Sequence, residues 1–272
     1  MRWLPVERED HRWEAMCIAP PSPARRLVWL PALGVPARHY EPLARALAAR
    51  GMAVVVHEWR GFGSSALRAS RGSSWGYREL LGSDIPATRD AARDAFPGTS
   101  ETIGGHSLGG QLATCSLALD ARGAEALWLV ASGAPFHGAF PWRYRVWLPL
   151  AYRLLDLLAQ AFGALPGRRI GFGGQEARGV IRDWSRTALT GRYAAPGLPD
   201  LEERLRSVRV PSRAVVLSQD WLAPRGSLDF LLRKLGDAPR TVVELDHARL
   251  GARPDHFEWM RAPDAVADAL AD

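Results

Sequence analysis

Asparagine is absent from this sequence and lysine occurs once, at Lys234, so arginine supplies nearly all of the positive charge. The formal net charge is +6 at pH 7, which raises the question of a nucleic-acid or membrane partner. A nucleic-acid binder concentrates its positive charge in one patch, whereas these arginines are scattered and most lie within a few residues of Asp or Glu. The charge therefore predicts a solvated, partly paired surface and no nucleic-acid partner.

Cysteine and long apolar runs are scarce as well. The two cysteines, Cys17 and Cys115, lie in apolar sequence and predict buried, reduced thiols, which favours a cytoplasmic location over an oxidising compartment. The N-terminus has no apolar stretch of the kind found in signal peptides. The longest apolar segment, residues 146–162, contains a proline and two charged residues and is too short to span a bilayer. We therefore expect no stable membrane insertion.

The composition that remains is that of a globular protein, since 47% of the 272 residues are hydrophobic. Apolar runs bounded by turn residues predict strands at 27–31, 52–57, 101–106 and 126–131. A helix is expected over residues 40–48, closed by a left-handed Gly51. A second helix is expected over 87–96, with Asp84 as its N-cap. Alternating strands and helices predict a parallel sheet covered on both faces.

This alternation stops near residue 136 and resumes near residue 213. Beyond the gap, strands and helices are predicted once more at 214–217, 227–235, 241–245 and from Pro263 onward. The intervening segment is rich in aromatic residues and contains a long helical pattern, whereas a linker is polar and low in aromatics. We therefore divide the chain into a core of residues 1–136 and 213–272 and an inserted helical cap, or lid, of residues 137–212.

Residues 105–109, Gly-His-Ser-Leu-Gly, fit the pattern G-x-S-x-G between a predicted strand and a predicted helix. The tight turn between such elements needs small residues around Ser107, because larger side chains collide with the neighbouring strand and helix. It presents the serine hydroxyl at the carboxyl edge of the sheet, near unpaired N–H groups at the helix start. The helix that follows is expected to bury Leu112 and Cys115 along one face. Ser107 is therefore the candidate nucleophile.

A serine nucleophile needs a base to accept its proton, and the base needs a carboxylate that holds its tautomer. Of the seven histidines, His256 and His247 follow the final predicted strand, and we favour His256, which stands just before the terminal helix. The others lie in a polar N-terminal segment, on the polar side of a helix, at a strand end, beside the serine or at the entrance to the cap (His11, His39, His57, His106 and His137). Asp220, in the turn after the penultimate strand, is the favoured acid, ahead of Asp229 and Asp246.

The anionic tetrahedral intermediate of such a reaction needs hydrogen-bond donors. One is expected to be the backbone N–H of Leu108, the residue after the serine. The second is expected from the turn after the first predicted strand, where spacing assigns it to the N–H of Leu33. Four tryptophans are candidates to line an apolar substrate pocket (Trp142, Trp147, Trp184 and Trp221).

With these motifs placed, the chain resembles the α/β-hydrolase superfamily and, within it, the bacterial branch of serine aminopeptidases and lysophospholipase-like hydrolases. The resemblance covers nearly the whole chain: PALGV at 31–35, EWRGFGSS at 58–65, the G-x-S-x-G turn, and the surroundings of Asp220 and His256 carry it. Two departures stand out from the pattern of many relatives. Proline and alanine replace His-Gly at the start of the first motif, and Glu58 replaces an aspartate.

The resemblance implies an α/β-hydrolase fold, with a mostly parallel central sheet, helices on both faces and an inserted, mainly helical cap. It implies that Ser107, Asp220 and His256 are catalytic, in the chain order that this fold uses, and that Leu33 and Leu108 supply the oxyanion hole. It also implies that the reaction needs no metal and no cofactor. The fold alone does not choose the substrate, because it serves many chemistries.

The leading hypothesis is a serine hydrolase that cleaves carboxylic esters or thioesters of small or medium, partly apolar molecules through an acyl-enzyme on Ser107. The alternatives with the same catalytic residues are an amide or peptide hydrolase of aminopeptidase type and an acyltransferase. An aminopeptidase needs an acid for the free amine of its substrate, and the two cap acids considered, Glu176 and Asp183, are expected to be solvated. A non-catalytic binding protein on this fold is a further alternative, and homo-oligomerisation is left open.

One segment of the expected cap combines arginines with large apolar residues. Residues 142–162 place Arg143, Arg145 and Arg153 beside tryptophan and leucine. This pattern predicts either a packed cap helix, which we favour, or a helix that touches an anionic membrane surface during substrate capture.

Overall fold

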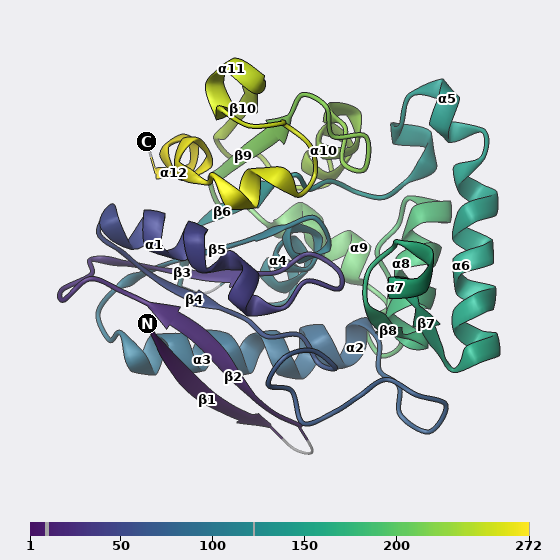
Figure 1. Cartoon of the computed structure of the whole chain (residues 1–272), viewed down its shortest axis with the longest axis horizontal. Helices are drawn as coiled ribbons and strands as arrows, with labels where there is room; N and C mark the ends of the chain where they lie inside the picture. Colours follow the sequence, from purple (N-terminus) through teal and green to yellow (C-terminus); the bar gives the residue numbers. More distant parts are fainter. Residues whose placement is uncertain (9–10, 122, 272) are drawn as a thin grey trace.

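The computed structural model describes residues 1–8, 11–121 and 123–271, and its centre is one eight-stranded sheet (Figure 1). The strands span Arg2–Arg8 (β1), His11–Ile18 (β2), Arg25–Leu30 (β3), Met52–Val56 (β4), Ser100–His106 (β5), Ala124–Val130 (β6), Ser212–Leu217 (β9) and Arg240–Leu245 (β10). Their order in the sheet is β1-β2-β4-β3-β5-β6-β9-β10. Strand β2 pairs antiparallel with β1 and β4, and all other neighbours are parallel.

Helices pack on both faces of this sheet (Figure 1). The larger ones span Glu41–Ala49 (α1), Ile85–Ala95 (α3), Leu108–Leu119 (α4), Arg225–Leu232 (α10) and Asp264–Ala271 (α12). Side chains of α1 and α12 share one buried cluster, and those of α3, α4 and α10 share another. Successive strand residues alternate between the two, since Val54 and Val56 belong to the first cluster and Val55 to the second. The predicted architecture, a mostly parallel sheet with helices on both faces, is confirmed.

The N-terminal hairpin of β1 and β2 is the part of the core that the sequence did not predict. Its strands are interrupted by charged residues that face solvent, and β1 lies at the edge of the sheet. The inward positions are nevertheless apolar or paired, as Trp13 and Ala15 show. His11, expected in a polar segment, is fully buried at the start of β2. An alternating edge strand carries too few apolar residues to stand out as a run.

Asp84 does not cap a helix, contrary to the prediction. The chain is helical from residue 77 to residue 95, through α2 (Tyr77–Glu79), a π-helical turn (Leu80–Asp84) and α3. The Asp84 carboxylate instead forms a bidentate ion pair with Arg60, with Nε–Oδ2 and Nη2–Oδ1 distances of 2.9 and 2.8 Å. Burial alone would raise the pKa of Asp84, but hydrogen bonds from Arg60 and His11 lower it below its usual value. The contacts tie β2 and the loop after β4 to this helix.

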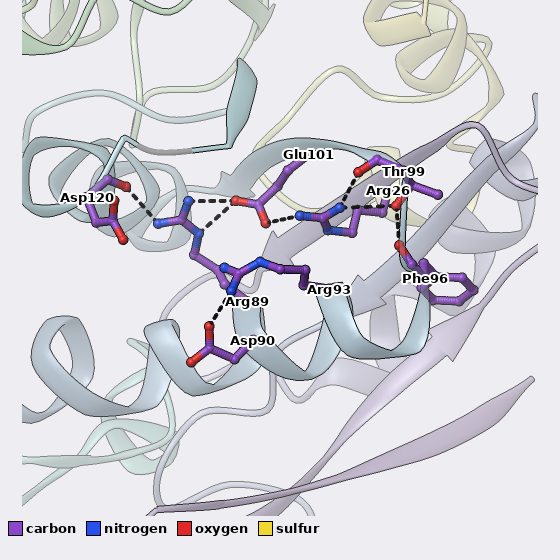
Figure 2. Close-up of polar contacts among 8 residues, drawn as sticks. All are labelled: Arg26, Arg89, Asp90, Arg93, Phe96, Thr99, Glu101 and Asp120. Carbon is purple, nitrogen blue, oxygen red and sulfur yellow. Dashed lines mark hydrogen bonds and ion pairs between the residues drawn. The ribbon is translucent and has the colours of Figure 1, made fainter.

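A second buried ion network joins the amino ends of β3 and β5 to α3 (Figure 2). Glu101 accepts hydrogen bonds from Arg26 (Nη2–Oε2, 2.9 Å) and from Arg89 (Nε–Oε1, 2.8 Å). Arg89 also donates to the carbonyl of Asp120 and Arg26 to the hydroxyl of Thr99, at 2.8 and 3.1 Å. Removing one member of a buried ion pair costs about 3–5 kcal/mol because a charge is left uncompensated. The network therefore fixes the end of the sheet that is opposite to Ser107.

The predicted cap, residues 137–212, runs from the loop after β6 to the first residue of β9. Its elements span His137–Ala139 (η3), Trp142–Arg145 (α5), Leu148–Phe162 (α6), Ala164–Pro166 (β7), Gly167–Ile170 (α7), Gln175–Ala177 (β8), Arg178–Thr190 (α8), Leu201–Arg204 (α9) and Leu205–Ser207 (η4). Helix α6 packs on α8 through two small clusters, one around Tyr152 and Ala188 and one around Ala159 and Ile181. By contrast, α9 and η4 bury Leu201 and Leu205 in the main core beside α4. The same core also includes Ala177 of β8 and Val180 of α8, so this segment packs partly on the core.

Candidate active site

Ser107 stands at the turn where β5 ends and α4 begins, with φ 54° and ψ −119°. A positive φ is costly for a residue with a side chain, and such strain is found chiefly at functional sites. Its N–H donates to the carbonyl of Val130 (3.2 Å), and its carbonyl accepts from the hydroxyl of Ser132 (2.7 Å). These contacts with β6 and the residues after it hold the strained turn in place.

Close packing explains the glycines around Ser107. A Cβ on Gly109 would lie 1.9 Å from the carbonyl oxygen of Leu30, and one on Gly105 would lie 2.4 Å from the carbonyl carbon of Gly109. No side chain fits at either position without moving backbone. Helix α4 is buried on every side rather than on the one face expected, because it runs between the sheet and the elements α9 and η4. The turn therefore has one fixed geometry.

His256 and Asp220 are in contact, since His256 Nδ1 lies 2.7 Å from Asp220 Oδ2. Asp220 follows β9, and its other carboxylate oxygen accepts from the backbone N–H groups of Leu222 (2.8 Å) and Ala223 (3.1 Å). The indole of Trp259 donates to the carbonyl of His256 at 3.0 Å. Both side chains of the pair are nearly buried. Bonds from three backbone or side-chain groups thus hold the pair in one orientation.

The rival candidates lie elsewhere. His247 is exposed at the start of the short helix α11 (His247–Leu250), and Asp246 caps that helix by accepting from the N–H of Arg249 at 2.9 Å. Asp229 forms an exposed ion pair with Arg225, one turn away on α10. None of these side chains is paired with another residue of the candidate set.

A cavity of about 330 Å³ brings Ser107 and His256 together. Leu33 and Leu108, whose N–H groups were predicted to bind an oxyanion, line it as well. The N–H of Ala32 is already used, because it donates to the hydroxyl of Tyr40 at 2.8 Å. The next residue along the turn, Leu33, lines the cavity, so its N–H is the next candidate donor. The structure gathers the candidate nucleophile, the candidate base and the two residues assigned as amide donors around one space.

Three of the four predicted pocket tryptophans line this cavity: Trp147, Trp184 and Trp221. Trp142 does not, because it lies at the start of α5 with 80% of its surface exposed. Most of the remaining wall is apolar, and a large part of it comes from the segment 140–172, through residues that the sequence did not single out (Phe140, Leu148, Ala151, Tyr152, Leu155 and Phe172). Within α6, helical spacing predicts that such positions are buried, but it does not distinguish the wall of a cavity from a core.

Tyr40 and His106 form a connection that the sequence did not reveal. The Tyr40 hydroxyl lies 2.9 Å from His106 Nδ1, so it joins the turn at Ala32 to the residue before Ser107. Burial and the neighbouring His256 hold the pKa of His106 well below its usual value, so its ring is neutral. The hydroxyl can therefore accept from Ala32 and donate to His106 at the same time. Tyr40 had appeared only as an apolar position of a helix.

The comparisons with known proteins now decide the family. The chain matches the serine aminopeptidase S33 family of hydrolases over residues 21–249. It belongs to this family. The predicted membership in the α/β-hydrolase superfamily is thereby confirmed, and the chain is an α/β-hydrolase. No curated protein is similar enough in sequence to give a match.

Solved structures share the fold of this S33-family hydrolase over nearly its whole length. The esterase domain of a Rhodothermus marinus protein is 16% identical, with a TM-score of 0.65 and coverage of 99% of this chain and 95% of that one. Est1E of Butyrivibrio proteoclasticus, solved with ferulic acid, is also 16% identical, with a TM-score of 0.65 and coverage of 97% and 95%. A monoacylglycerol lipase of Paleococcus ferrophilus has 16% identity, a TM-score of 0.61 and coverage of 95% and 98%.

Glu176 and Asp183 of this S33-family hydrolase are buried, contrary to the expectation that they are solvated. Asp183 accepts from the N–H of Tyr77 at 2.9 Å, and Glu176 accepts from the N–H of Gly174 at 2.7 Å. Burial raises the pKa of Glu176 to about 7, although the Gly174 N–H and Arg168 act in the opposite direction. Neither acid lines the cavity that holds Ser107, and no carboxylate does within the described chain. Both acids instead bind backbone.

Two further kinds of feature are absent from residues 1–8, 11–121 and 123–271. In these ranges, no three His, Cys, Asp or Glu side chains are grouped so that they could hold a metal ion. Within residues 1–8, 11–121 and 123–271, no helix has both the length and the hydrophobicity that crossing a membrane requires.

Proposed function

We propose that this S33-family hydrolase cleaves carboxylic esters through an acyl-enzyme on Ser107, with His256 as base and Asp220 as its orienting acid. The observation that supports the proposal is the shared cavity: a serine on a strained turn and a histidine paired at 2.7 Å with a buried carboxylate face the same apolar space. Nucleophile, base and orienting group in this relation are the parts that acyl transfer requires.

The steps follow from these positions. The Ser107 hydroxyl attacks the ester carbonyl carbon as His256 Nε2 accepts its proton, and the carbonyl oxygen becomes an oxyanion that the N–H groups of Leu33 and Leu108 bind. The tetrahedral intermediate then collapses, and the protonated His256 gives its proton to the departing alcohol. Water attacks the acyl-enzyme in the same way and releases the acid. The Asp220 carboxylate accepts the hydrogen bond from Nδ1–H throughout and stabilises the imidazolium whenever it forms.

The wall of the cavity supports a small or medium, partly apolar substrate. Its lining is largely apolar, and Gln111 and the ring nitrogens of the tryptophans are among its few polar groups apart from Ser107 and His256. A space of about 330 Å³ with few polar groups suits an acyl chain, of an ester or a thioester, better than a sugar or a peptide. We infer that residues 137–212 act as the cap, because much of this wall comes from them. Both cysteines are free and buried, which supports cytoplasmic action.

Aminopeptidase activity is the alternative that the cavity disfavours. Such an enzyme must bind the free amine of its substrate, and an acid in the site is the usual partner for it. The cavity wall contains no carboxylate in the described chain, and both Glu176 and Asp183 are turned to backbone groups. Acyl transfer to an alcohol or amine in place of water uses the same residues, and product analysis with added alcohol separates it from hydrolysis.

A fluorophosphonate probe and p-nitrophenyl esters of increasing chain length test the proposal. We expect the probe to label the wild type, Ser107→Ala to lose labelling, and ester hydrolysis by this variant to fall by about 10⁴-fold or more. Ser207→Ala, which changes an exposed serine far along the chain on η4, is the matched control and should retain both signals. Labelling of Ser107→Ala equal to that of the wild type would contradict the nucleophile assignment. A wild type inert to every ester would favour a binding protein instead.

A further inference from the structure

The outward side of α5 and α6 presents a row of exposed apolar side chains. Helix α6 runs along the outer edge of the molecule, away from the central sheet (Figure 1). The row, called here the apolar row, has exposed fractions from 80% at its start to 53% near its middle (Trp142, Val146, Leu150, Leu154, Leu157 and Phe162). Spacings of four and three residues place Leu150, Leu154 and Leu157 on one face of α6, and Phe162 stands at the C-terminal end of the helix. Fifteen residues of α6 extend about 22 Å, so the row is long as well as apolar.

Exposed large apolar side chains are not spread evenly over the surface. Three other exposed aromatic side chains, Trp147, Trp221 and Phe257, also line the cavity, so they lie where it meets solvent. The exposed large apolar residues outside these two groups are Met1, Trp3 and Ile170, within the described chain. Nine of the twelve exposed large apolar residues of the described chain therefore belong to two groups, the apolar row and the mouth of the cavity. Such gathering on a protein surface marks an interaction site.

Positive charge accompanies the apolar row. Arg143 and Arg145 are exposed on α5, and Arg153 is exposed on α6 between Leu150 and Leu157. In the described part of the chain none of these three arginines pairs with a carboxylate. The acid of the segment, Asp156, is half-buried and accepts from the side chain of Gln160 at 3.1 Å. The face that meets solvent is thus both apolar and cationic.

The positive charge favours an anionic lipid surface over a second copy of the chain as the partner of this face. A second copy of the chain, related by two-fold symmetry, would bring the same arginines against each other, because each copy buries the same patch. An anionic lipid surface complements them, with about 1 kcal/mol for each arginine near the surface. Tryptophan and leucine on one helix face with arginine beside them are also the composition of helices that lie in a bilayer interface.

We propose that the apolar row, with Arg143, Arg145 and Arg153, binds peripherally to anionic lipid bilayers. The opposite side of α6 lines the cavity through Leu148, Ala151 and Leu155. A helix bound through its outer face would therefore lie between the lipid surface and the cavity, and the cavity would be within roughly one helix diameter of the place where amphiphilic esters are concentrated. Binding itself needs no catalysis, so the proposal stands apart from the proposed function.

Co-sedimentation with two kinds of vesicle tests it: pure phosphatidylcholine, and equal parts of phosphatidylcholine and phosphatidylglycerol. We expect the wild type to bind the anionic vesicles at least tenfold more tightly than the neutral ones. The double variant Leu150→Ser/Leu157→Ser should bind anionic vesicles about tenfold more weakly, and Arg143→Gln/Arg145→Gln/Arg153→Gln should lose the preference for anionic lipid.

Two control variants remove an exposed apolar side chain or three exposed arginines from other parts of the surface. Trp3→Ser removes an exposed apolar side chain from β1, and Arg12→Gln/Arg45→Gln/Arg261→Gln removes three exposed arginines from β2, α1 and η5 (Glu258–Arg261). Both should bind anionic vesicles as the wild type does. Equal sedimentation with both vesicle types, or equal loss in the arginine control, would overturn the proposal. So would a dimer in light scattering that the leucine variant abolishes while neither protein binds vesicles.

The readout distinguishes this proposal from the proposed function. Hydrolysis of a short, water-soluble ester reports the active site alone, and circular dichroism reports the fold. Wild-type protein that binds anionic vesicles but hydrolyses no ester would support the lipid-binding proposal and contradict the proposed esterase function. Wild-type protein that hydrolyses short esters but ignores anionic vesicles would do the reverse.

Discussion

At the scale of single residues, the Tyr40 hydroxyl has a role that its position in a helix does not suggest. It accepts from the N–H of Ala32 and lies 2.9 Å from His106 Nδ1, so one oxygen joins the proposed oxyanion turn to the residue before Ser107. Burial raises the pKa of Tyr40 far above its usual value, so the hydroxyl keeps its proton. If the Tyr40 hydroxyl is lost, the turn that carries one proposed donor can move relative to the nucleophile. Catalysis is sensitive to such displacements.

We therefore expect Tyr40→Phe to lower kcat for p-nitrophenyl esters by about tenfold while KM changes little, because an oxyanion donor acts in the transition state. Stability should fall by about 1–3 kcal/mol, since buried polar groups of Ala32 and His106 lose their partner. Initial rates and urea unfolding measure the two effects. Thr88→Val is the control: it removes a buried hydroxyl 2.8 Å from His57 Nδ1, away from the cavity, and should cost stability without changing kcat. Equal kcat for all three proteins would refute the positioning role.

Residue positions also show where sequence reasoning succeeded and where it stopped. The turn at Ser107 was placed correctly because its glycines and flanking elements are local in the chain. The pairing of His256 with Asp220 was a prediction across distant loops, and the 2.7 Å contact supports it without testing catalysis. Burial of Glu176 was missed because nothing near it in the sequence shows that Gly174 and the oxyanion turn cover it. Trp142 was misplaced because an exposed and a pocket tryptophan look alike in sequence.

At the scale of elements, the loop between α7 and β8 packs directly on the proposed oxyanion turn. A Cβ on Gly34 would lie 2.3 Å from the backbone nitrogen of Gly174, so the two backbones touch. Gly34 also has φ 76°, which favours glycine. Glu176 holds this loop through its bond to the N–H of Gly174 at 2.7 Å. A buried carboxyl group therefore fixes the loop that covers the proposed oxyanion hole.

The pKa of Glu176 predicts a dependence of stability on pH. Its folded value is about 7 because of burial, whereas an unfolded glutamate titrates near about 4.3. Between these values the folded state holds more protons, so the stabilisation that this group contributes is full below about pH 4 and is lost as the pH rises toward about 7. The loss amounts to roughly 3 kcal/mol.

Glu176→Gln keeps an acceptor for Gly174 but does not titrate. We expect the unfolding free energy of the wild type, relative to this variant, to fall by roughly 3 kcal/mol between about pH 4 and about pH 8. Urea titrations at several pH values measure it. Glu203→Gln, at an exposed carboxylate of α9, should show a difference that does not vary with pH beyond about 0.5 kcal/mol. A constant difference for Glu176→Gln as well would contradict the assignment.

Elements were predicted well where apolar residues form runs. The parallel strands and the helices between them have apolar faces that appear in the sequence, so their places agreed with the structure. The hairpin of β1 and β2 has alternating charges and was missed, because half-exposed edge strands lack such runs. The N-cap assigned to Asp84 was wrong because a buried partner, Arg60, competes for the carboxylate. Tertiary contacts of this kind outweigh local preference.

At the scale of the whole molecule, α6 separates two environments. Its inner side, including Ala151 and Leu155, lines the cavity, and its outer side carries Leu150 and Leu154 toward solvent. The helix therefore serves two proposed tasks that substitutions can separate. Changes on the inner side should alter which acyl chain is accepted, while changes on the outer side should alter where the protein binds.

We expect Ala151→Phe to move the preferred p-nitrophenyl ester toward shorter acyl chains, because the added ring occupies part of the 330 Å³ that the acyl group fills. The longest esters that the wild type hydrolyses should lose about tenfold or more in kcat/KM, while the acetate ester changes little. Leu154→Ala, one turn away on the outer side, should leave the whole profile unchanged. Initial rates across the series measure it. A profile that shifts equally in both variants, or in neither, would show that the acyl group does not lie against α6 and that the proposed cap forms no part of the acyl site.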